Sequence, residues 1–468
     1  MLASIEKKER TVRVMQFGEG NFLRAFADYI LQTANEKGLT DTNVAIVNPL
    51  AFDLPERFAN QKCNYNVVVR GLQDGKEIDS EKIITVVEKT VSPSSELDAY
   101  KELYLSPDLR FVISNTTEAG IVLDKEDDFN LPYPKSFPGK VTKLLFERFE
   151  HFGGAADKGL FFLPVELIED NGKQLKRCVL ELAKIWNLGD AFAKWVDEAC
   201  VFASTLVDRI VSGYPRDTIE MYDKRLGYHD DLLVVTEPYY LWVIEADERL
   251  HEELPLDQVI PQVVFAPIRP YRERKVRLLN GSHTILTPVA LLWGKTFVRE
   301  CMGDEKLAAY LEKAVMEEIL PGIDCLPREE LVDFYHAVRE RFANPFMDHA
   351  LMSISLNTVS KYHARVLPSV EAYCKANGKA PRLLTFAFAA TLAFLTKEEK
   401  VQDTEDILAF LAAHREDEAE ALMEAVFAEG IFAKEMRALP GFEAMALADL
   451  KAIRAEGIEA ALKKAMEE

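Results

Sequence analysis

Apolar and polar positions follow two different patterns along the chain. In the first half, short and nearly continuous apolar runs alternate with helical patterns, as expected for buried parallel strands that are connected by helices. This alternation predicts an open α/β sheet. The predicted strands span 12–17, 44–47, 65–70, 83–87, 111–114 and 159–164, and the predicted helices between them include 22–37 and 140–152.

From about residue 278 onward, long helical patterns rich in Ala, Leu, Glu and Lys replace the alternation. The residues after Gly430 predict a terminal helical hairpin or cap. We therefore predict an α/β domain over residues 1–260 and a mainly α-helical domain over residues 261–468, with the ligand site in the cleft between them. The predicted helices of this second half include 305–319, 328–342, 383–395, 404–414 and 416–428.

The amino-acid composition argues against some classes of binding partner. The 468 residues include 77 acidic and 56 basic side chains, for a formal net charge of −21, which argues against nucleic acid or an anionic membrane as a partner. The six cysteines are scattered without a Cys-x-x-Cys pair, which is typical of reduced thiols rather than of a disulfide framework or a zinc site. The absence of a signal-like N-terminus and of long apolar runs predicts a cytoplasmic protein. The oligomeric state stays open.

A glycine turn follows the first predicted strand and opens the first predicted helix. Gly18 permits a tight turn, and Gly20 would let the backbone approach a pyrophosphate. The third glycine of the dinucleotide-binding pattern is replaced by Leu23, so the match is incomplete. An ordinary turn is the alternative interpretation. The segment predicted to bind a cofactor is Phe17-Gly18-Glu19-Gly20-Asn21-Phe22-Leu23-Arg24.

Two further strand ends are candidates for the cofactor edge. Asn48 follows the second strand, where a carboxylate would favour NAD, so the residues leave NAD and NADP open. Asn115 and Thr116 follow the strand 111–114, at the carboxyl edge where ligands of open sheets gather. A capped strand end with polar turn residues explains the same pattern.

The segment 273–284 carries the most informative group of polar side chains. If this segment forms an α-helix, Lys275, Asn280 and His283 fall within an arc of roughly 140°. Interconversion of an alcohol and a ketone needs a proton acceptor and a donor for the developing oxyanion, and these side chains can supply both without a metal. The arginines between residues 272 and 277 could lower the pKa of the lysine. The alternative is a solvated basic helix surface.

These residues resemble the long-chain polyol dehydrogenase family typified by mannitol 2-dehydrogenase. The resemblance implies a Rossmann-type first domain, NAD as the cofactor, and metal-independent interconversion of D-tagaturonate and D-altronate in hexuronate catabolism. It also implies that Lys275 is the general acid/base, that Asn280 helps to form the oxyanion site and that His283 contacts the substrate. The segments that carry the resemblance are 15–26, 110–121, 143–149, 204–216 and 274–280.

The same resemblance suggests further substrate-binding residues. Asp208, followed by Arg209, matches a family motif near the active site, and Lys361 matches a family lysine that reaches the substrate. The chain departs from the polyol enzymes at Glu166-Leu167 before Asn171, where Leu167 replaces an oxyanion donor, and at Ser353, which replaces an arginine. Glu166 and Asn171 are candidates for a different substrate shell. The cation for a sugar-acid carboxylate is either Lys361 or an arginine of the 272–277 cluster.

Two alternatives accompany this prediction. Reduction of fructuronate to mannonate, or of another polyol or sugar acid, would use the same fold and catalytic residues. A catalytically silent nucleotide-binding regulatory protein is the alternative from a different class, although an intact Lys275, Asn280 and His283 argue against it.

Overall fold

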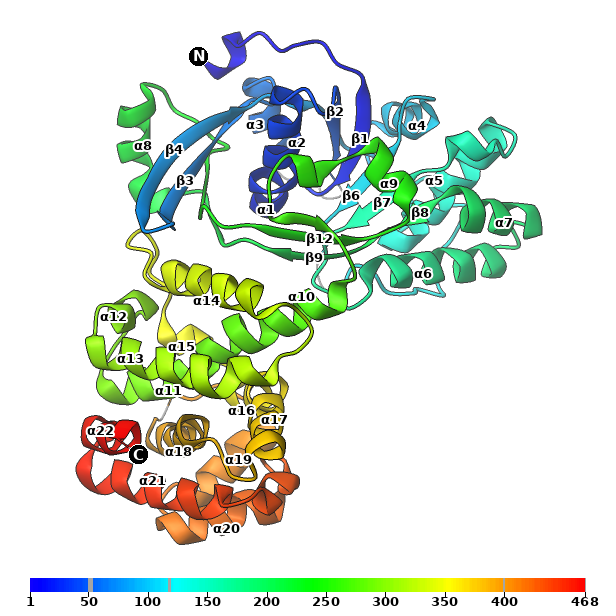
Figure 1. Ribbon diagram of the computed structural model, residues 1–468. Coiled ribbons are helices and arrows are strands. Elements are labelled where there is room, and N and C mark those ends of the chain that lie inside the picture. Colours follow the sequence, from blue (N-terminus) through cyan, green and yellow to red (C-terminus); the bar gives the residue numbers. More distant parts are fainter. Residues whose placement is uncertain (49–53, 117–118, 399, 468) are drawn as a thin grey trace. The chain divides into compact units, whose positions relative to one another are not determined.

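The computed structural model describes residues 1–48, 54–116, 119–398 and 400–467 (Figure 1). The chain divides into two compact units. The first contains residues 1–70 and 77–268, and the second contains residues 71–76 and 269–468. The sequence pattern places the division at residue 260, and the ligand site expected between the domains stays a prediction.

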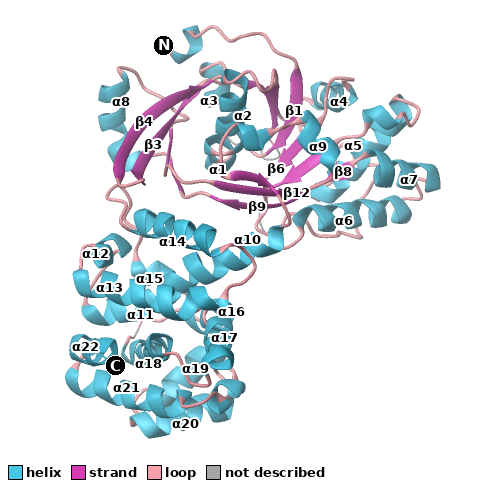
Figure 2. Cartoon of the chain, viewed as in Figure 1, coloured by secondary structure: helices cyan, strands magenta, loops and turns pink. Residues whose placement is uncertain are grey.

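A parallel sheet of six strands organises the first unit, in the order β5-β2-β1-β6-β7-β8 (Figure 2). Numbered along the chain within this sheet, the order is 3-2-1-4-5-6, which is that of doubly wound dinucleotide-binding folds. The strands are β1 (Val12–Phe17), β2 (Asn43–Val47), β5 (Val87–Val91), β6 (Phe111–Ser114), β7 (Phe161–Pro164) and β8 (Val201–Phe202).

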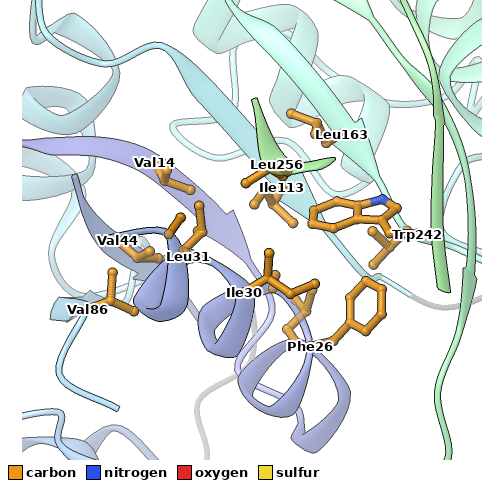
Figure 3. Close-up of a cluster of buried hydrophobic side chains, with 14 of the residues drawn as sticks. Val14, Phe26, Ile30, Leu31, Val44, Val86, Ile113, Leu163, Trp242 and Leu256 are labelled. Atoms are coloured by element: carbon orange, nitrogen blue, oxygen red, sulfur yellow. The ribbon is translucent and has the colours of Figure 1, made fainter. Parts of the chain in front are cut away.

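Both faces of this sheet are apolar because alternate residues of each strand enter different hydrophobic clusters. Along β2, Val44 and Ile46 join one cluster, whereas Ala45 and Val47 join the other. Figure 3 shows the first cluster, in which Trp242 packs against Phe26 with ring centroids 5.2 Å apart. The first cluster includes residues of α1 (Asn21–Ala25) and α2 (Ala27–Glu36), and the second includes residues of α4 (Leu97–Leu105), α5 (Phe137–His151), α6 (Asn171–Ile185) and α7 (Asp190–Ala199).

Two smaller sheets complete the first unit, with the orders β10-β11-β3-β4 and β13-β12-β9. Their strands are β3 (Tyr65–Gln73), β4 (Lys76–Ile84), β9 (Ser204–Asp208), β10 (Val211–Gly213), β11 (Val234–Thr236), β12 (Leu241–Glu245) and β13 (Val263–Phe265). The remaining α-helices of this unit are α3 (Leu54–Asn60), α8 (Ile219–Leu226) and α9 (Glu248–Glu253).

Two of the elements that were predicted as continuous are each divided into two in the structure. The predicted strand 83–87 is divided between β4 and β5, which belong to different sheets. Between the two strands, the Gln32 side chain accepts a hydrogen bond from the Thr85 N–H at 3.0 Å, so this N–H is not available to a sheet partner. The predicted helix 22–37 is interrupted at Phe26, which separates α1 from α2 and has a distorted right-handed backbone (φ −117°, ψ −79°).

The second unit is helical and is built around α18 (Arg382–Lys397), nearly all of whose residues are buried. The buried Glu318 accepts hydrogen bonds from the N–H groups of Leu383 and Leu384, which supports the start of α18. A helical rod packs against α18 and consists of α10 (Ile268–Arg274), a π turn (Lys275–Asn280) and α11 (Gly281–Trp293). Residues 71–76 join this unit through Gly75, whose N–H donates to the Glu340 carboxylate at 2.6 Å.

The other helices of the second unit match the predicted pattern closely, except that residues 314–319 of the predicted helix 305–319 form a second π turn (Ala314–Ile319). Among the described residues, no helix is both long and apolar enough to cross a membrane. The remaining α-helices are α12 (Val298–Met302), α13 (Glu305–Lys313), α14 (Arg328–Phe342), α15 (Leu351–Ile354), α16 (Thr358–Arg365), α17 (Leu367–Asn377), α19 (Glu405–His414), α20 (Ala419–Glu429), α21 (Phe442–Glu456) and α22 (Ile458–Glu467).

Candidate functional site

Gly18 lies between the carboxyl ends of β2 and β6, where the strand order reverses. Its N–H donates to the Val47 carbonyl at 3.2 Å. Its φ of +117° is in the region that favours glycine, and a Cβ added there would lie 3.2 Å from Leu23 Cδ1 and 3.3 Å from the Asn115 carbonyl oxygen. The turn therefore requires glycine at this position, and Leu23 packs beneath it in place of the third glycine.

Gly20 is exposed, and a Cβ added there would meet no heavy atom within 4 Å. This open backbone leaves room for a ligand to approach the start of α1. Two aromatic residues predicted to bind the cofactor pack against other rings, Phe17 as a buried residue and Phe22 as a partly buried one, and their contact with a cofactor stays a prediction. Phe17 packs edge-on against Phe137 at 5.2 Å, and Phe22 stacks on Phe26 at 4.9 Å.

Arg24 supports the turn from inside the protein, and its predicted role in cofactor binding stays a prediction. Its Nε donates to the Glu19 carbonyl at 3.1 Å, its Nη2 donates to Asn21 Oδ1 at 2.6 Å, and its Nη1 donates to the Leu232 carbonyl. Burial lowers the pKa of this guanidinium. Desolvation likewise raises the pKa of the half-buried Glu19 carboxyl.

The other predicted cofactor residues end neighbouring strands of the same sheet. Asn48 is buried after β2, and its N–H donates to the Val91 carbonyl at 2.9 Å. The N–H of Asn115 donates to the Phe17 carbonyl at 3.1 Å, which holds the end of β6 beside the glycine turn. The topology therefore gathers these strand ends with Gly18 at one edge.

Glu166 connects the ends of β6 and β7 and is neither a surface charge nor a helix cap. Its side chain is 2% exposed. One carboxylate oxygen accepts from the Thr116 N–H at 2.9 Å and from Thr116 Oγ1 at 2.8 Å, and the other accepts from Ser114 Oγ at 3.1 Å. Burial raises the pKa of this carboxyl, and these hydrogen bonds oppose that shift. Both carboxylate oxygens of Glu166 thus stabilise the carboxyl end of β6, at the sheet edge where a substrate contact was predicted.

The Asn171 side chain has a structural role, because its contacts in the structure are to backbone groups rather than to a ligand position. Its amide group donates to the carbonyls of Pro164 and Glu166 at 3.0 Å each and to the Thr205 carbonyl at 3.2 Å. Its oxygen accepts from the N–H groups of Gly172 and Thr205 at 2.8 Å. The whole amide is thus occupied in joining β7, β9 and the start of α6.

Arg209 is also structural, whereas Asp208 ends β9 in a buried position. The Arg209 guanidinium donates to the Glu237 carbonyl at 3.1 and 2.9 Å and to the Ala25 carbonyl, and it lies 4.6 Å from the centre of the Tyr240 ring. Burial lowers its pKa to about 10. The predicted substrate role of Arg209 is therefore replaced by internal contacts.

The helix that carries the predicted catalytic residues is not a regular α-helix, which corrects the assumption behind the 140° arc. Lys275 begins the π turn and Asn280 ends it. A π turn bonds residues five apart, so these two residues lie about one turn from each other, and such turns are frequent at functional sites. From residue 277 to residue 290, every residue is buried except Asn280 and His283. Lys275 is likewise partly exposed, so all three side chains are partly exposed on the second unit, although the Nε2 atom of His283 is buried.

His283 is fixed by two rings that the sequence pattern did not identify. It stacks on Phe342 with ring centroids 4.1 Å apart and meets His349 edge-on at 5.1 Å. Burial, together with the nearby Arg341 charge, lowers the pKa of His349. His349 lies outside any periodic segment, so no sequence signal linked it to His283.

Two of the arginines near Lys275 are buried, whereas Arg272 is partly exposed. Arg274 is buried, with its guanidinium 4.3 Å from the centre of the Phe334 ring. Arg277 is also buried and donates to Ser369 Oγ at 2.6 Å and to Glu273 at 3.2 Å. These contacts commit both guanidinium groups to the packing of the second unit.

Lys361 lies on α16, which packs against the π turn and α11. Its Nζ donates to the Ile354 carbonyl at 2.8 Å. Burial, together with the nearby Arg365 charge, lowers the pKa of this amine. Within the described residues, no three His, Cys, Asp or Glu side chains are grouped so that they could hold a metal ion.

Comparison with known proteins gives the same two-part division. The sequence models of the mannitol dehydrogenase Rossmann domain and the mannitol dehydrogenase C-terminal domain match residues 12–258 and 267–454. The chain is 42% identical over 465 residues to the altronate oxidoreductases of Klebsiella pneumoniae (strain 342) and Escherichia coli (strain K12 / MC4100 / BW2952), covering 96% of this chain and of each relative.

Solved structures share the fold at lower sequence identity. D-sorbitol dehydrogenase in its substrate-free form has a TM-score of 0.82 at 22% identity, over 97% of this chain and 95% of that one. The ternary complex of Pseudomonas fluorescens mannitol 2-dehydrogenase with NAD and D-mannitol has a TM-score of 0.67 at 21% identity, over 100% of this chain and 96% of that one. The chain therefore belongs to the mannitol dehydrogenase family, as an oxidoreductase whose Rossmann domain precedes the family's C-terminal domain.

Proposed function

We propose that this oxidoreductase uses NAD to interconvert D-altronate and D-tagaturonate, in a metal-independent reaction of hexuronate catabolism. The observation that carries the proposal is the 42% identity to altronate oxidoreductases over nearly the whole chain, in a sequence that keeps Lys275, Asn280 and His283 partly exposed on one helical rod. The alcohol–ketone chemistry of a sugar acid needs the functional groups that these three side chains provide.

The glycine turn has the conformation and the position in the sheet that a dinucleotide site needs. Gly18 has a conformation and surroundings that exclude a Cβ, Gly20 is open, and both lie at the sheet edge where such cofactors bind. When bound, NAD supplies the hydride acceptor for alcohol oxidation. Asn48 ends β2 without a carboxylate, so the preference for NAD over NADP rests on the similarity to the family rather than on a charge at this strand.

Lys275 acts as the general base in the oxidative direction. In its neutral form it takes the hydroxyl proton of altronate, and in reduction it returns that proton as the general acid. The Asn280 amide donates a hydrogen bond to the reacting oxygen as negative charge develops on it. His283 offers a ring nitrogen to the same oxygen, and its stacking on Phe342 restricts the orientation of the ring.

The substrate carboxylate is bound by Lys361 in this proposal. Arg274 and Arg277 are buried against Phe334, Ser369 and Glu273, so neither is free to turn toward a ligand, and the partly exposed Arg272 is the alternative cation. The Lys361 amine makes one hydrogen bond to a backbone carbonyl, which a carboxylate can replace with a stronger charge-assisted bond.

A substrate panel tests the assignment. Purified protein with NADH should oxidise the cofactor in the presence of tagaturonate, followed by the loss of nicotinamide absorbance, and NADPH should support a slower rate. Faster turnover with fructuronate would instead assign the protein to mannonate formation. Binding of NADH without turnover of any uronate would support a regulatory protein.

The Lys275→Ala variant tests the proton-transfer role. We expect kcat to fall by at least about a thousandfold, while the dissociation constant of NADH stays within about twofold of wild type. Lys375→Ala is the matched control, because Lys375 is an exposed lysine of the same unit. Retention of substantial activity in Lys275→Ala would contradict the mechanism.

A further inference from the structure

The buried guanidinium of Arg24 makes contacts to both sides of the glycine turn. Arg24 is 4% exposed, so the side chain is covered by protein on nearly all sides. It binds the Glu19 carbonyl inside the turn and the Asn21 side chain at the start of α1. Its remaining donor group reaches the Leu232 carbonyl, more than two hundred residues away in the chain. Arg24 thus connects the turn to a distant loop.

That loop is itself firmly held. The Asp230 carboxylate accepts from the Leu232 N–H at 2.9 Å, from the Asn66 N–H at 2.7 Å and from Gln61 Nε2 at 2.9 Å. These bonds join the loop to β3 and to the end of α3. The Tyr65 ring centre lies 5.4 Å from the Arg24 guanidinium, which fixes one face of the group. The guanidinium is therefore attached to a rigid part of the first unit.

In the part of the chain that the structure describes, the turn has two further backbone attachments at Gly18. The Gly18 N–H donates to the Val47 carbonyl, and the Gly18 carbonyl accepts from Gln16 Nε2 at 3.1 Å. Beyond Gly18, Gly20 is exposed, and α1 is only five residues long. Within the described residues, the Arg24 guanidinium holds the Glu19 carbonyl and the Asn21 side chain, and the Arg24 N–H donates to the Gly20 carbonyl at 3.3 Å. A lysine cannot replace this guanidinium, because its ammonium lacks the planar set of donors that reaches three acceptors at once.

We propose that Arg24 is a positioning residue that holds the backbone of the glycine turn in the conformation that binds the pyrophosphate of the cofactor. This inference rests on the proposed NAD-dependent function. It assigns the loop at Asp230 a part in cofactor affinity, although that loop acts only through Arg24. The effect belongs to cofactor binding and not to the proton transfer at Lys275.

The Arg24→Lys variant tests the proposal. We expect the dissociation constant and the KM of NADH to rise at least about tenfold, while kcat at saturating NADH changes less than about threefold. Arg148→Lys is the matched control. Arg148 is an equally buried arginine on α5, whose guanidinium also binds backbone carbonyls, including those of Lys158 and Leu109, but it does not contact the turn.

A second variant, Asp230→Asn, changes the loop that supports Arg24 and leaves the residues of the turn itself unchanged. Asp230→Asn should raise the dissociation constant of NADH severalfold, and the double variant Arg24→Lys/Asp230→Asn should be little worse than Arg24→Lys alone, because both changes act through one contact. Additive effects, or an equal loss of NADH affinity in Arg148→Lys, would overturn the proposal.

Hydrogen–deuterium exchange of the cofactor-free chain separates this inference from the proposed function. In Arg24→Lys, the amides of residues 18–21 should exchange faster than in wild type, and in Arg148→Lys they should not. Unchanged exchange at the turn refutes the positioning role whether or not the protein binds NADH. Faster exchange in a protein that does not bind NADH would instead refute the proposed cofactor and leave the contact established.

Discussion

Asp28 provides a test of how burial and the nearby Arg24 charge set the pKa of a carboxyl group in the first unit. The residue lies on α2 with no exposed surface, and Tyr65 donates a hydrogen bond to its carboxyl group at 2.7 Å. Desolvation raises its pKa from 3.8 to about 7, against the hydrogen bonds from Tyr65 and Gln16 and the positive charge of Arg24. The folded protein therefore holds a proton on Asp28 that the unfolded chain releases at a much lower pH.

The sign and size of the effect follow from this difference. Because the folded-state pKa is raised, the contribution of Asp28 to the free energy of unfolding is fully present below the unfolded pKa of 3.8 and is lost as pH rises through about 7. A shift of about 3 units, at about 1.4 kcal/mol per unit, gives a loss of at most about 4 kcal/mol. In Asp28→Asn the side chain cannot ionise and can still accept from Tyr65. Relative to wild type, this variant should therefore gain up to about 4 kcal/mol between about pH 4 and pH 8.

Urea unfolding followed by circular dichroism, at several pH values across this range, measures the difference. Asp41→Asn is the control, because Asp41 is an exposed aspartate of the same unit that pairs with Arg10 and Lys8, and its pKa is lowered rather than raised. A difference between Asp28→Asn and wild type that stays constant with pH would show that Asp28 is ionised throughout. It would also show that the positive charge of Arg24 outweighs the cost of burial.

Three further predictions concern the sheet edge and the second unit. Gly18→Ala should destabilise the protein by about 1–3 kcal/mol, because of its left-handed backbone and the close Leu23 side chain, and calorimetry together with NADH titration would detect the change. Asn171→Ala should lower the free energy of unfolding by about 2–4 kcal/mol, because buried backbone groups lose their partners; a loss below about 1 kcal/mol in urea unfolding would refute its bracing role. Lys361→Met should raise the KM for tagaturonate at least about tenfold and leave the KM for NADH nearly unchanged, and equal changes in steady-state kinetics would remove Lys361 from the substrate site.

Local apolar patterns and residue types were enough to predict most elements and the candidate chemistry. Largely apolar runs identified β1 and β6 with the boundaries that the structure has, because a strand buried on both faces favours apolar residues at most positions. The glycine turn was identified for a similar reason, since a left-handed backbone at Gly18 requires glycine. Lys275, Asn280 and His283 stood out because few residue types can perform proton transfer and stabilise an oxyanion.

The packing of distant segments determines which polar side chains remain accessible to a ligand, and local patterns do not show it. Arg24, Asn171 and Arg209 resemble binding residues in the sequence, yet the fold uses their donors to satisfy buried carbonyls. A side chain's identity fixes how many hydrogen bonds it can make, but its partners come from segments far away in the chain. The same reason explains why His349 was missed: its contact with His283 exists only after α11 and the segment that follows α14 have packed together.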